Sequence, residues 1–358
     1  MALLIDGGRI PPRWLEKKAV RPARLHDRYG SEAECVEIAL INNMPDAALE
    51  DTEMQFMELL DAASGDIPVR LKLCSLPKVP RGDRGQRHLN SFYFGIDDLW
   101  TNRCDAVIMT GTEPRQPDLR QESYWSALAD VLDWAERNTV STVLSCLAAH
   151  ASVLHSDGIR RQPLSDKQFG VFGSERVLDH ELTRHAGSSI QFPHSRWNEV
   201  REEDLTSCGY DVLTKSSQAG VDLFVKRKKK SLFVHFQGHP EYGAQTLLKE
   251  YRRDIKRFLR RERETYPTMP HGYFDAATSK LLTEFQETAL AHPREEQLVF
   301  FPEAVVIGAL QNTWNPSATC VYRNWLQYVL SKKAETSVLA AMTVPYAQQL
   351  QRKRSAVS

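Results

Sequence analysis

The segment STVLSCLAAHASVLH (141–155) decides the fold. Its first six residues are predicted to form a short strand, and the residues that follow open a helix. The pattern places Cys146 at a strand-to-helix junction, where the positive end of the helix dipole favours a thiolate. The next backbone N–H, that of Leu147, can stabilise an oxyanion. On position alone, a buried and inert cysteine is the commoner case.

The residues before this segment repeat the alternation of strand and helix. Three apolar runs predict buried strands, at 36–42, 69–76 and 106–111. Asp46 can cap a helix that ends near Gly65, and residues 122–138 form a second amphipathic helix. Residues 81–88, rich in Arg and Gly, are predicted to be part of a long loop. Strands alternating with helices predict an α/β fold, a mostly parallel sheet with helices on both faces.

The second half of the chain has a different pattern. Three closely spaced runs predict added antiparallel strands, at 210–217, 221–227 and 231–238. The basic stretch KRKKK (226–230) stands where a hairpin turn belongs, and a solvated turn is its simplest interpretation. An amphipathic helix is predicted over about 244–261. A C-terminal segment then contains a helix at 278–292 and an aromatic stretch around Trp325.

Composition restricts the class of protein. The 358 residues include 46 basic and 46 acidic side chains, so the net charge is zero and nothing requires a nucleic acid or an anionic membrane as a partner. No apolar run is long enough for a membrane span, and the N-terminus does not read as a secretory signal. The six scattered cysteines form no C-x-x-C pair, which predicts reduced thiols, no metal site and a cytoplasmic location. We expect an N-terminal arm (1–30), a single domain (31–330) and a C-terminal tail (331–358).

A second chemical element lies in FQGHPEY (236–242), at the end of a predicted strand. Pro240 favours an extended conformation for His239. In an extended segment, His239 and Glu241 point to the same side. Glu241 can therefore orient the imidazole while its other nitrogen faces a thiol, the arrangement of a catalytic triad. Together with Cys146, the segment predicts a nucleophile, a base and an orienting carboxylate.

Several separated motifs, in order, resemble the homoserine O-acyltransferases of bacterial methionine biosynthesis, which have a class I glutamine-amidotransferase-like fold. The resemblance covers about residues 35–330. It is carried by INNMP (41–45), TEMQF (52–56), HLNSFYFGIDD (88–98), STVLSCLA (141–148), DKQFGVF (166–172), PHSRW (193–197), GHPEYGAQTL (238–247), KEYRRD (249–254) and NW (324–325).

The resemblance implies a two-step transfer from acyl-CoA to an amino alcohol, homoserine in this family, with no bound cofactor. It assigns Cys146 as the nucleophile, His239 as the base and Glu241 as its orienter. The family's contacts with the amino-acid substrate are matched by Lys167, Ser195 and Arg253. An arginine can form two parallel hydrogen bonds with the substrate α-carboxylate. Without the family, simpler explanations are favoured: a pair with Glu250 on its own helix for Arg253, a solvated surface lysine for Lys167 and a turn hydroxyl for Ser195.

Departures from the family pattern concern two loops. After Met–Pro the family carries a lysine, whereas this chain has Asp46 and Ala47. A later loop position governs donor choice in the family, where Gly leaves room for succinyl and Glu favours acetyl. Ungapped alignment places Arg115 there, and a shifted loop places Glu113 there instead. A guanidinium would pair with the free carboxylate of a succinyl group, so we expect succinyl-CoA as the donor.

Other readings remain open at this stage. One alternative is a homoserine or serine O-acetyltransferase that uses acetyl-CoA, and a remoter one is a glutamine amidotransferase-like hydrolase. The latter class has Gly two residues before and after its cysteine, where this chain has Leu144 and Ala148. The KRKKK turn could also contact coenzyme A phosphates, and His150 is best explained as a core histidine. The family and the unpatterned arm together imply a homodimer.

Overall fold

The computed structural model describes residues 3–18, 35–102 and 104–355. Its centre is an eight-stranded sheet in the order β1-β3-β2-β4-β5-β12-β11-β8. The first six of these strands run parallel, and the last two are antiparallel to their neighbours. Their bounds in spatial order are Leu3–Ile5, Val69–Cys74, Val36–Ile41, Ala106–Thr110, Ser141–Ser145, Ser231–Phe236, Leu223–Lys228 and Asp211–Val212.

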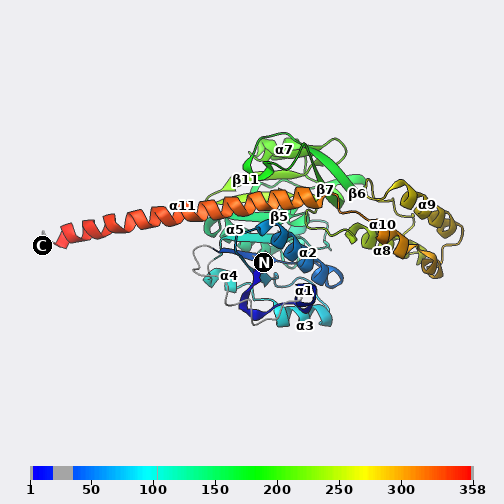
Figure 1. Ribbon diagram of the computed structural model, residues 1–358, viewed down its shortest axis with the longest axis horizontal. Coiled ribbons are helices and arrows are strands. Elements are labelled where there is room, and N and C mark those ends of the chain that lie inside the picture. The colour runs from blue at the N-terminus through cyan, green and yellow to red at the C-terminus, as the bar shows by residue number, and fades with distance from the viewer. Residues whose placement is uncertain (1–2, 19–34, 103, 356–358) are drawn as a thin grey trace.

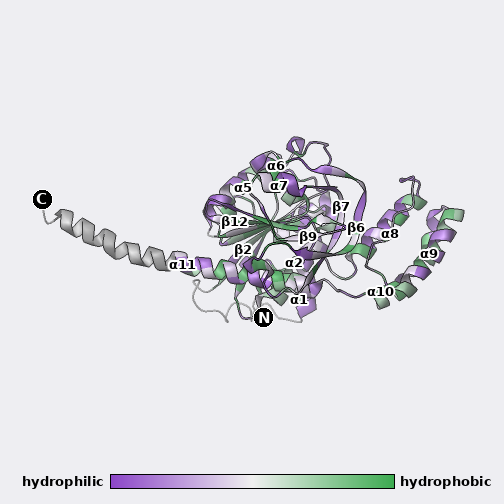
Figure 2. Cartoon of the chain, turned by 90° about the horizontal axis from the view of Figure 1, so that it is seen from above, coloured by the Kyte–Doolittle hydropathy of each residue, from purple (hydrophilic) through white to green (hydrophobic). Residues whose placement is uncertain are grey.

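Helices cover both faces of this sheet, as the sequence predicts (Figures 1 and 2). Alternate strand residues point to opposite faces, so Leu40 packs with one hydrophobic cluster and Ile41 with the other. The cluster around Leu40 includes side chains of α2 (Asp46–Ser64) and α11 (Asn315–Ser355). The cluster around Ile41 includes those of α5 (Trp125–Asn138) and α6 (Leu147–Asp157). The central parallel strands are therefore buried on both sides, which explains the nearly unbroken apolar sequence of β4.

A second sheet is antiparallel, with the strand order β10-β9-β6-β7. Its two longest strands are not predicted from the sequence. These are β6 (Gln162–Arg176) and β7 (Ser189–Glu199), and the short ones are β9 (Thr214–Ser216) and β10 (Gly220–Val221). The register of β6 and β7 shifts between Pro163 and Gln168, which marks an irregularity in the ladder. Polar residues are frequent in both strands, so their apolar alternation is weak.

The C-terminal helical segment forms its own small core at one end of the molecule (Figure 1). Helix α8 (Thr246–Leu259) contributes Leu248, Tyr251 and Ile255, which pack against α9 (Ala276–Ala291) and the strands beneath it. The segment continues through a 3-10 turn, η5 (Glu295–Phe300), and α10 (Glu303–Ala309). Trp325 of α11 then returns to the main sheet, where its Nε1 donates to the hydroxyl of Ser141 at 2.9 Å.

Two local predictions are wrong. The expected loop over residues 81–88 is mostly helix, because α3 spans Asp83–Phe92. Asp46 begins α2 but does not cap it. Its Oδ2 accepts hydrogen bonds from the backbone N–H groups of Gly82 (2.9 Å) and Gly85 (3.2 Å), so it caps α3 instead. A Cβ at residue 85 would lie 2.1 Å from this carboxylate, so a larger residue there would displace the Asp46 side chain from its capping position.

The three runs expected as antiparallel strands are only partly so. β12 is antiparallel to β11, yet it lies parallel to β5 and so belongs to the main parallel ladder. The remaining short elements are α1 (Pro12–Lys18), α4 (Asp98–Thr101), α7 (Glu202–Ser207) and the 3-10 turns at Asp6–Gly8, Leu119–Gln121 and Glu181–Thr183.

The proposed arm and tail fall partly outside the described residues, at 1–2 and 19–30 of the arm and 356–358 of the tail. Within the described part, β1 pairs with β3, and residues 331–355 continue helix α11. None of the helices in the described ranges is both long enough and apolar enough to cross a membrane.

Candidate active site

Cys146 lies between the carboxyl end of β5 and the first turn of α6, at the N-cap position of that helix. Its φ of 51° and ψ of −110° are unusual for a residue with a side chain, and such strain is typical of a nucleophile at a sharp turn. The backbone N–H of Cys146 donates to the carbonyl of Phe236 at 2.8 Å, which fixes the turn to β12. A bulky residue, Leu144, fits two positions before Cys146 because its side chain is buried in the core.

Gly111 allows the loop after β4 to approach this turn. A Cβ at residue 111 would lie 2.4 Å from the Cβ of Leu147, so a side chain there would displace the first residue of α6. The backbone N–H of Leu147 is one of the first N–H groups of the helix, which have no partner within the helix. It therefore stands where an oxyanion beside Cys146 can accept its hydrogen bond.

The pairing of β5 with β12 brings the second element to the cysteine. Ser145 lies opposite Phe236 in the parallel ladder, and the chain continues through Gly238 into His239. The backbone N–H of His239 donates to the carbonyl of Pro193 at 2.7 Å. Its Nδ1 lies 2.9 Å from Oε1 of Glu241, which also accepts a hydrogen bond from the Ser145 hydroxyl at 3.1 Å. The expected orienting contact between His239 and Glu241 is present.

Charge stabilises the protonated form of His239. Burial acts to lower the pKa of the imidazole, but the negative charges of Cys146 and Glu241 outweigh it. The pKa of His239 is consequently raised well above its ordinary value. Cys146 and Glu241 thus both favour the protonated form of His239.

The three residues matched to amino-acid contacts come from three elements and meet at one carboxylate. Glu250 of α8 accepts hydrogen bonds from the Ser195 hydroxyl on β7 and from the Lys167 ammonium on β6, the latter at 3.4 Å. Arg253 lies 3.8 Å from the same oxygen of Glu250. Strand pairing explains part of this arrangement, because Phe169, two residues after Lys167, lies opposite Ser195.

Asp254 is a second acidic partner of this cluster. Its carboxylate lies 3.2 Å from the Lys167 ammonium and 3.1 Å from Nε of Arg253. Burial opposes the charged guanidinium, but Asp254 and Glu250 outweigh it and raise the pKa of Arg253. The intrahelical pair between Arg253 and Glu250, anticipated from spacing alone, is therefore present together with the clustering that the family resemblance predicts.

The loop after β4 carries Glu113 and Arg115, both exposed. Oε1 of the buried Glu122 holds this loop, because it accepts the backbone N–H groups of Arg115 (2.5 Å) and Gln116 (2.7 Å). Glu113 lies within electrostatic range of Arg253 and helps to raise the pKa of that residue. No ion pair joins Glu113 to Arg115 among the described residues.

Sequence reasoning missed several residues of this site. Glu250 and Tyr242 lie inside quoted motifs, but only three-dimensional contacts reveal that they meet, with the Tyr242 hydroxyl donating to Oε1 of Glu250 at 2.7 Å. Arg161 and Arg196 lie within electrostatic range of Cys146, and burial lowers the pKa of each guanidinium. The run Arg160–Arg161 follows a helix end, where basic residues are common, so its pattern gives no sign of the site.

Two other expectations concern basic side chains. His150 is a buried histidine, as expected, with Nε2 3.0 Å from Oε1 of Gln237, and burial lowers its pKa to about 3. The KRKKK stretch is only partly a turn, because residues 226–228 end strand β11 and only Lys229 and Lys230 form the turn to β12. That turn lies at the amino ends of β5 and β12, opposite the edge that carries Cys146, so it does not reach the site. No cluster of potential metal ligands occurs among the described residues.

Comparisons with known proteins agree with the motifs. Residues 7–336 match the family described as Homoserine O-succinyltransferase. The homoserine O-succinyltransferase of Rhodopseudomonas palustris is 43% identical over 322 residues, which covers 90% of this chain and 95% of that protein. The protein of the same name from Bradyrhizobium japonicum is 42% identical over 330 residues, covering 92% of this chain and 99% of that protein.

Solved structures with similar folds are much more distant in sequence. A glutamine amidotransferase from Thermotoga maritima is 11% identical, with a TM-score of 0.44 over 82% of this chain and 98% of that one. A glutamine amidotransferase from Methylobacillus flagellatus is 13% identical, with a TM-score of 0.42 over 82% of this chain and 95% of that one. The family match and the close relatives span nearly the whole sequence, and the chain belongs to the homoserine O-succinyltransferase family.

Proposed function

We propose that this protein transfers a succinyl group from succinyl-CoA to the side-chain hydroxyl of L-homoserine, through a thioester on Cys146. The observation that carries the proposal is the contact between His239 and Glu241 at the end of β12, beside Cys146 at the end of β5. The residues matched to the acceptor contacts gather near this group, around Glu250. Family membership supports the choice of substrates.

In the first step, the Cys146 thiolate attacks the thioester carbonyl of succinyl-CoA. The oxyanion that forms accepts a hydrogen bond from the backbone N–H of Leu147. The intermediate collapses with cleavage of the bond to the CoA sulfur, which takes the proton of the His239 imidazolium and leaves as a thiol. The products of this step are a succinyl thioester on Cys146 and a neutral His239, held in orientation by Glu241.

In the second step, His239 accepts the proton of the homoserine hydroxyl while its oxygen attacks the thioester carbonyl. Cleavage of the carbon–sulfur bond then releases O-succinylhomoserine and restores the thiolate and the imidazolium. Arg253 and Lys167 are cations suited to the acceptor carboxylate, with Ser195 beside them. Glu250, which already accepts hydrogen bonds from Lys167 and Ser195, is suited to the acceptor ammonium.

Donor choice is assigned to the loop after β4. Arg115 would pair with the free carboxylate of the succinyl group, whereas an acetyl group offers it no partner. Glu113 is the contrary candidate, since a carboxylate facing the acyl group would repel succinate and favour acetyl-CoA. The electrostatic contact of Glu113 with Arg253 supports a place for Glu113 on the acceptor side of the site.

Intact-protein mass spectrometry after mixing with succinyl-CoA tests the covalent mechanism. We expect one succinyl adduct on the wild type, lost after addition of homoserine, and none on Cys146→Ala. Cys146→Ala should abolish transfer while circular dichroism shows a folded protein. Near-full turnover by Cys146→Ala would refute the thioester. A small matrix of donors and acceptors separates this activity from an O-acetyltransferase.

We also propose a cytoplasmic homodimer, with residues 31–330 as one domain, 1–30 as an arm and 331–358 as a tail. Sedimentation at micromolar concentration tests the assembly. A single species of 40.8 kDa would contradict the dimer.

A further inference from the structure

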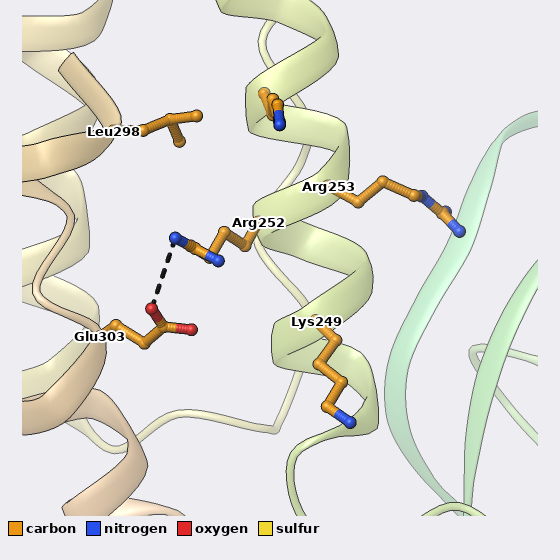
Figure 3. A pocket seen from close by; sticks show the side chains of 6 residues that line it. Lys249, Arg252, Arg253, Leu298 and Glu303 are labelled. Atoms are coloured by element: carbon orange, nitrogen blue, oxygen red, sulfur yellow. Dashed lines mark ion pairs between the residues drawn. The ribbon is translucent and has the colours of Figure 1, made fainter. Parts of the chain in front are cut away.

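A basic cavity of about 290 Å³ lies between helix α8 and the η5–α10 segment (Figure 3). Its lining contains four cations, one carboxylate and one apolar side chain. These are Lys249, Arg252, Arg253, Lys256, Glu303 and Leu298. In Figure 3, Arg252 of α8 points across the cavity toward Glu303, with Leu298 on the same facing side. The preponderance of positive charge makes this a site for an anion.

The spacing of the cations places them on neighbouring turns of α8, and in Figure 3 Arg252 extends toward Glu303 while Lys249 and Arg253 extend away from it. Lys249, Arg252 and Lys256 are three and four residues apart, so they form one stripe on the helix. The opposite face carries Leu248, Tyr251 and Ile255, which are buried. This division fixes α8 in place and leaves the basic stripe turned away from the core.

The ion pairs of Arg252 and Lys256 are long enough to be displaced, whereas Lys249 is held by Asp51 at 2.5 Å. Arg252 lies 3.4 Å from Glu303, and Lys256 lies 3.5 Å from Glu295, with 43% and 45% of the two basic side chains exposed. Exposed pairs of this kind contribute little to stability. In addition, Nε of Arg252 is shielded from solvent and has no hydrogen-bond partner in the described part of the chain. An anion with several acceptor oxygens would satisfy this donor.

The cavity adjoins the acceptor cluster. Arg253 contributes to its lining, and the same side chain contacts Asp254 and Glu250, which hold Lys167. Glu250 in turn accepts the hydroxyl of Tyr242, whose ring stacks on that of His239. A substrate that places one end at Cys146 and extends past Tyr242 would therefore bring its other end toward α8.

We propose that this cavity binds the phosphate groups of the acyl-CoA donor, an inference that rests on the proposed function. Acyl-CoA carries its phosphates at the far end of a long, flexible pantetheine arm, separated from the thioester. Arginine can bind a phosphate through two parallel hydrogen bonds, and lysine supplies a compact point charge beside it. Arg252 and Lys256, with Lys249 on the same helix, match a ligand with a diphosphate and a ribose phosphate, while Arg253 faces the acceptor cluster.

Substrate truncation tests the assignment without disturbing the chemistry. We would compare succinyl-CoA, succinyl-dephospho-CoA, which lacks the ribose phosphate, and succinyl-pantetheine, which lacks the whole nucleotide. Arg252→Gln and Lys256→Gln should each raise the KM for succinyl-CoA about tenfold, the loss of one charge-assisted hydrogen bond. Neither should change the KM for succinyl-pantetheine or the kcat for any donor.

Arg257→Gln is the matched control. Arg257 lies on the same helix but does not line the cavity. Its side chain is 46% exposed, and its ion pair with Asp254 is long, at 3.9 Å. It should leave the KM for all three donors unchanged. Thermal unfolding of each variant checks that α8 still packs against its neighbours.

Each outcome is informative. If the cavity variants raise the KM for succinyl-CoA alone, the cavity binds the ribose phosphate. If they also raise the KM for succinyl-dephospho-CoA, the cavity binds the diphosphate. Equal KM values for wild type and both cavity variants, or an equal rise with succinyl-pantetheine, would overturn the assignment while acylation of Cys146 stands. Failure of the wild type to acquire a succinyl adduct from any of the donors would overturn the proposed function, and this inference with it.

Discussion

The ring of Tyr242 stacks on the ring of His239, with their centroids 4.2 Å apart and their planes inclined by 17°. The Tyr242 hydroxyl donates to Glu250, the carboxylate at which Lys167 and Ser195 meet. One side chain thus contacts both the candidate base and the cluster proposed to bind the acceptor. A shift of the acceptor cluster would move the surface against which the imidazole rests.

Replacement of Glu241 by Gln should lower the pKa of His239. Burial alone disfavours the imidazolium, and Glu241 is one of the two charges that raise its pKa well above the ordinary value. The protonated form should therefore be lost at a lower pH in the variant than in the wild type. Histidine NMR titration measures both midpoints, and a midpoint that does not move would contradict the coupling.

The same pair should affect stability with a defined sign. Because the folded-state pKa of His239 is raised, its favourable contribution is fully present below the ordinary histidine pKa and is lost as pH rises through the raised value.

For activity, His239→Ala should lower kcat/KM by roughly 10²–10⁴-fold. Glu241→Gln should cost less, because it keeps the base, and a larger loss than in His239→Ala would contradict these roles.

Substitution of Arg253 by Lys should raise the KM for homoserine. Lysine keeps the charge but cannot form two parallel hydrogen bonds with the substrate carboxylate. The loss of one such bond corresponds to about 1.5–3 kcal/mol, roughly a ten- to hundredfold rise. Steady-state kinetics with homoserine varied provides the measurement. An unchanged homoserine KM in a folded variant would leave Arg253 as a structural partner of Glu250.

Removal of the Arg115 side chain should weaken the preference for succinyl-CoA over acetyl-CoA. Only the backbone N–H of Arg115 is engaged by Glu122, so Arg115→Ala should preserve the loop. We expect the ratio of kcat/KM for the two donors to exceed one in the wild type and to fall about tenfold in the variant. A wild-type ratio below one would refute succinyl as the donor. A high ratio that survives the substitution would point to another cation, and Arg161 is the first to examine because it lies near Cys146.

Removal of the Asp46 carboxylate should destabilise the protein by about 1 kcal/mol. Its Oδ2 accepts the backbone N–H groups of Gly82 and Gly85, which open α3. Denaturant unfolding of Asp46→Ala gives the change in free energy. Asp83→Ala is a suitable control, because Asp83 lies in the first turn of the same helix but is not its cap. Equal losses in the two variants would indicate a general charge effect and not a cap.

The sequence is sufficient to predict the parallel core and the contact between His239 and Glu241. Strand Ala106–Thr110 is buried at every residue, and its apolar sequence is easily recognised. His239 and Glu241 are adjacent to the end of such a strand, and local geometry alone places them on one side. These elements depend on short-range patterns, which a sequence displays directly.

Features that depend on long-range contacts were not predictable in the same way. The capping of α3 by Asp46 joins residues 36 to 39 positions apart, so it left no local signal. The hairpin of β6 and β7 carries many polar residues, and its ladder contains a register shift, which obscures the alternation. Glu250 seemed an ordinary helix residue until Tyr242, Ser195 and Lys167 were found around it.

The three-residue strand Leu3–Ile5 has a practical consequence for production of this protein. By pairing with Val69–Leu71 it covers the outer side of β3, and it leaves only a very short strand at that border of the sheet. A long exposed edge invites pairing with a second molecule and aggregation. Expression tags are therefore better separated from Leu3 by a flexible spacer, and shortened versions that lack the first residues should be less soluble at high concentration.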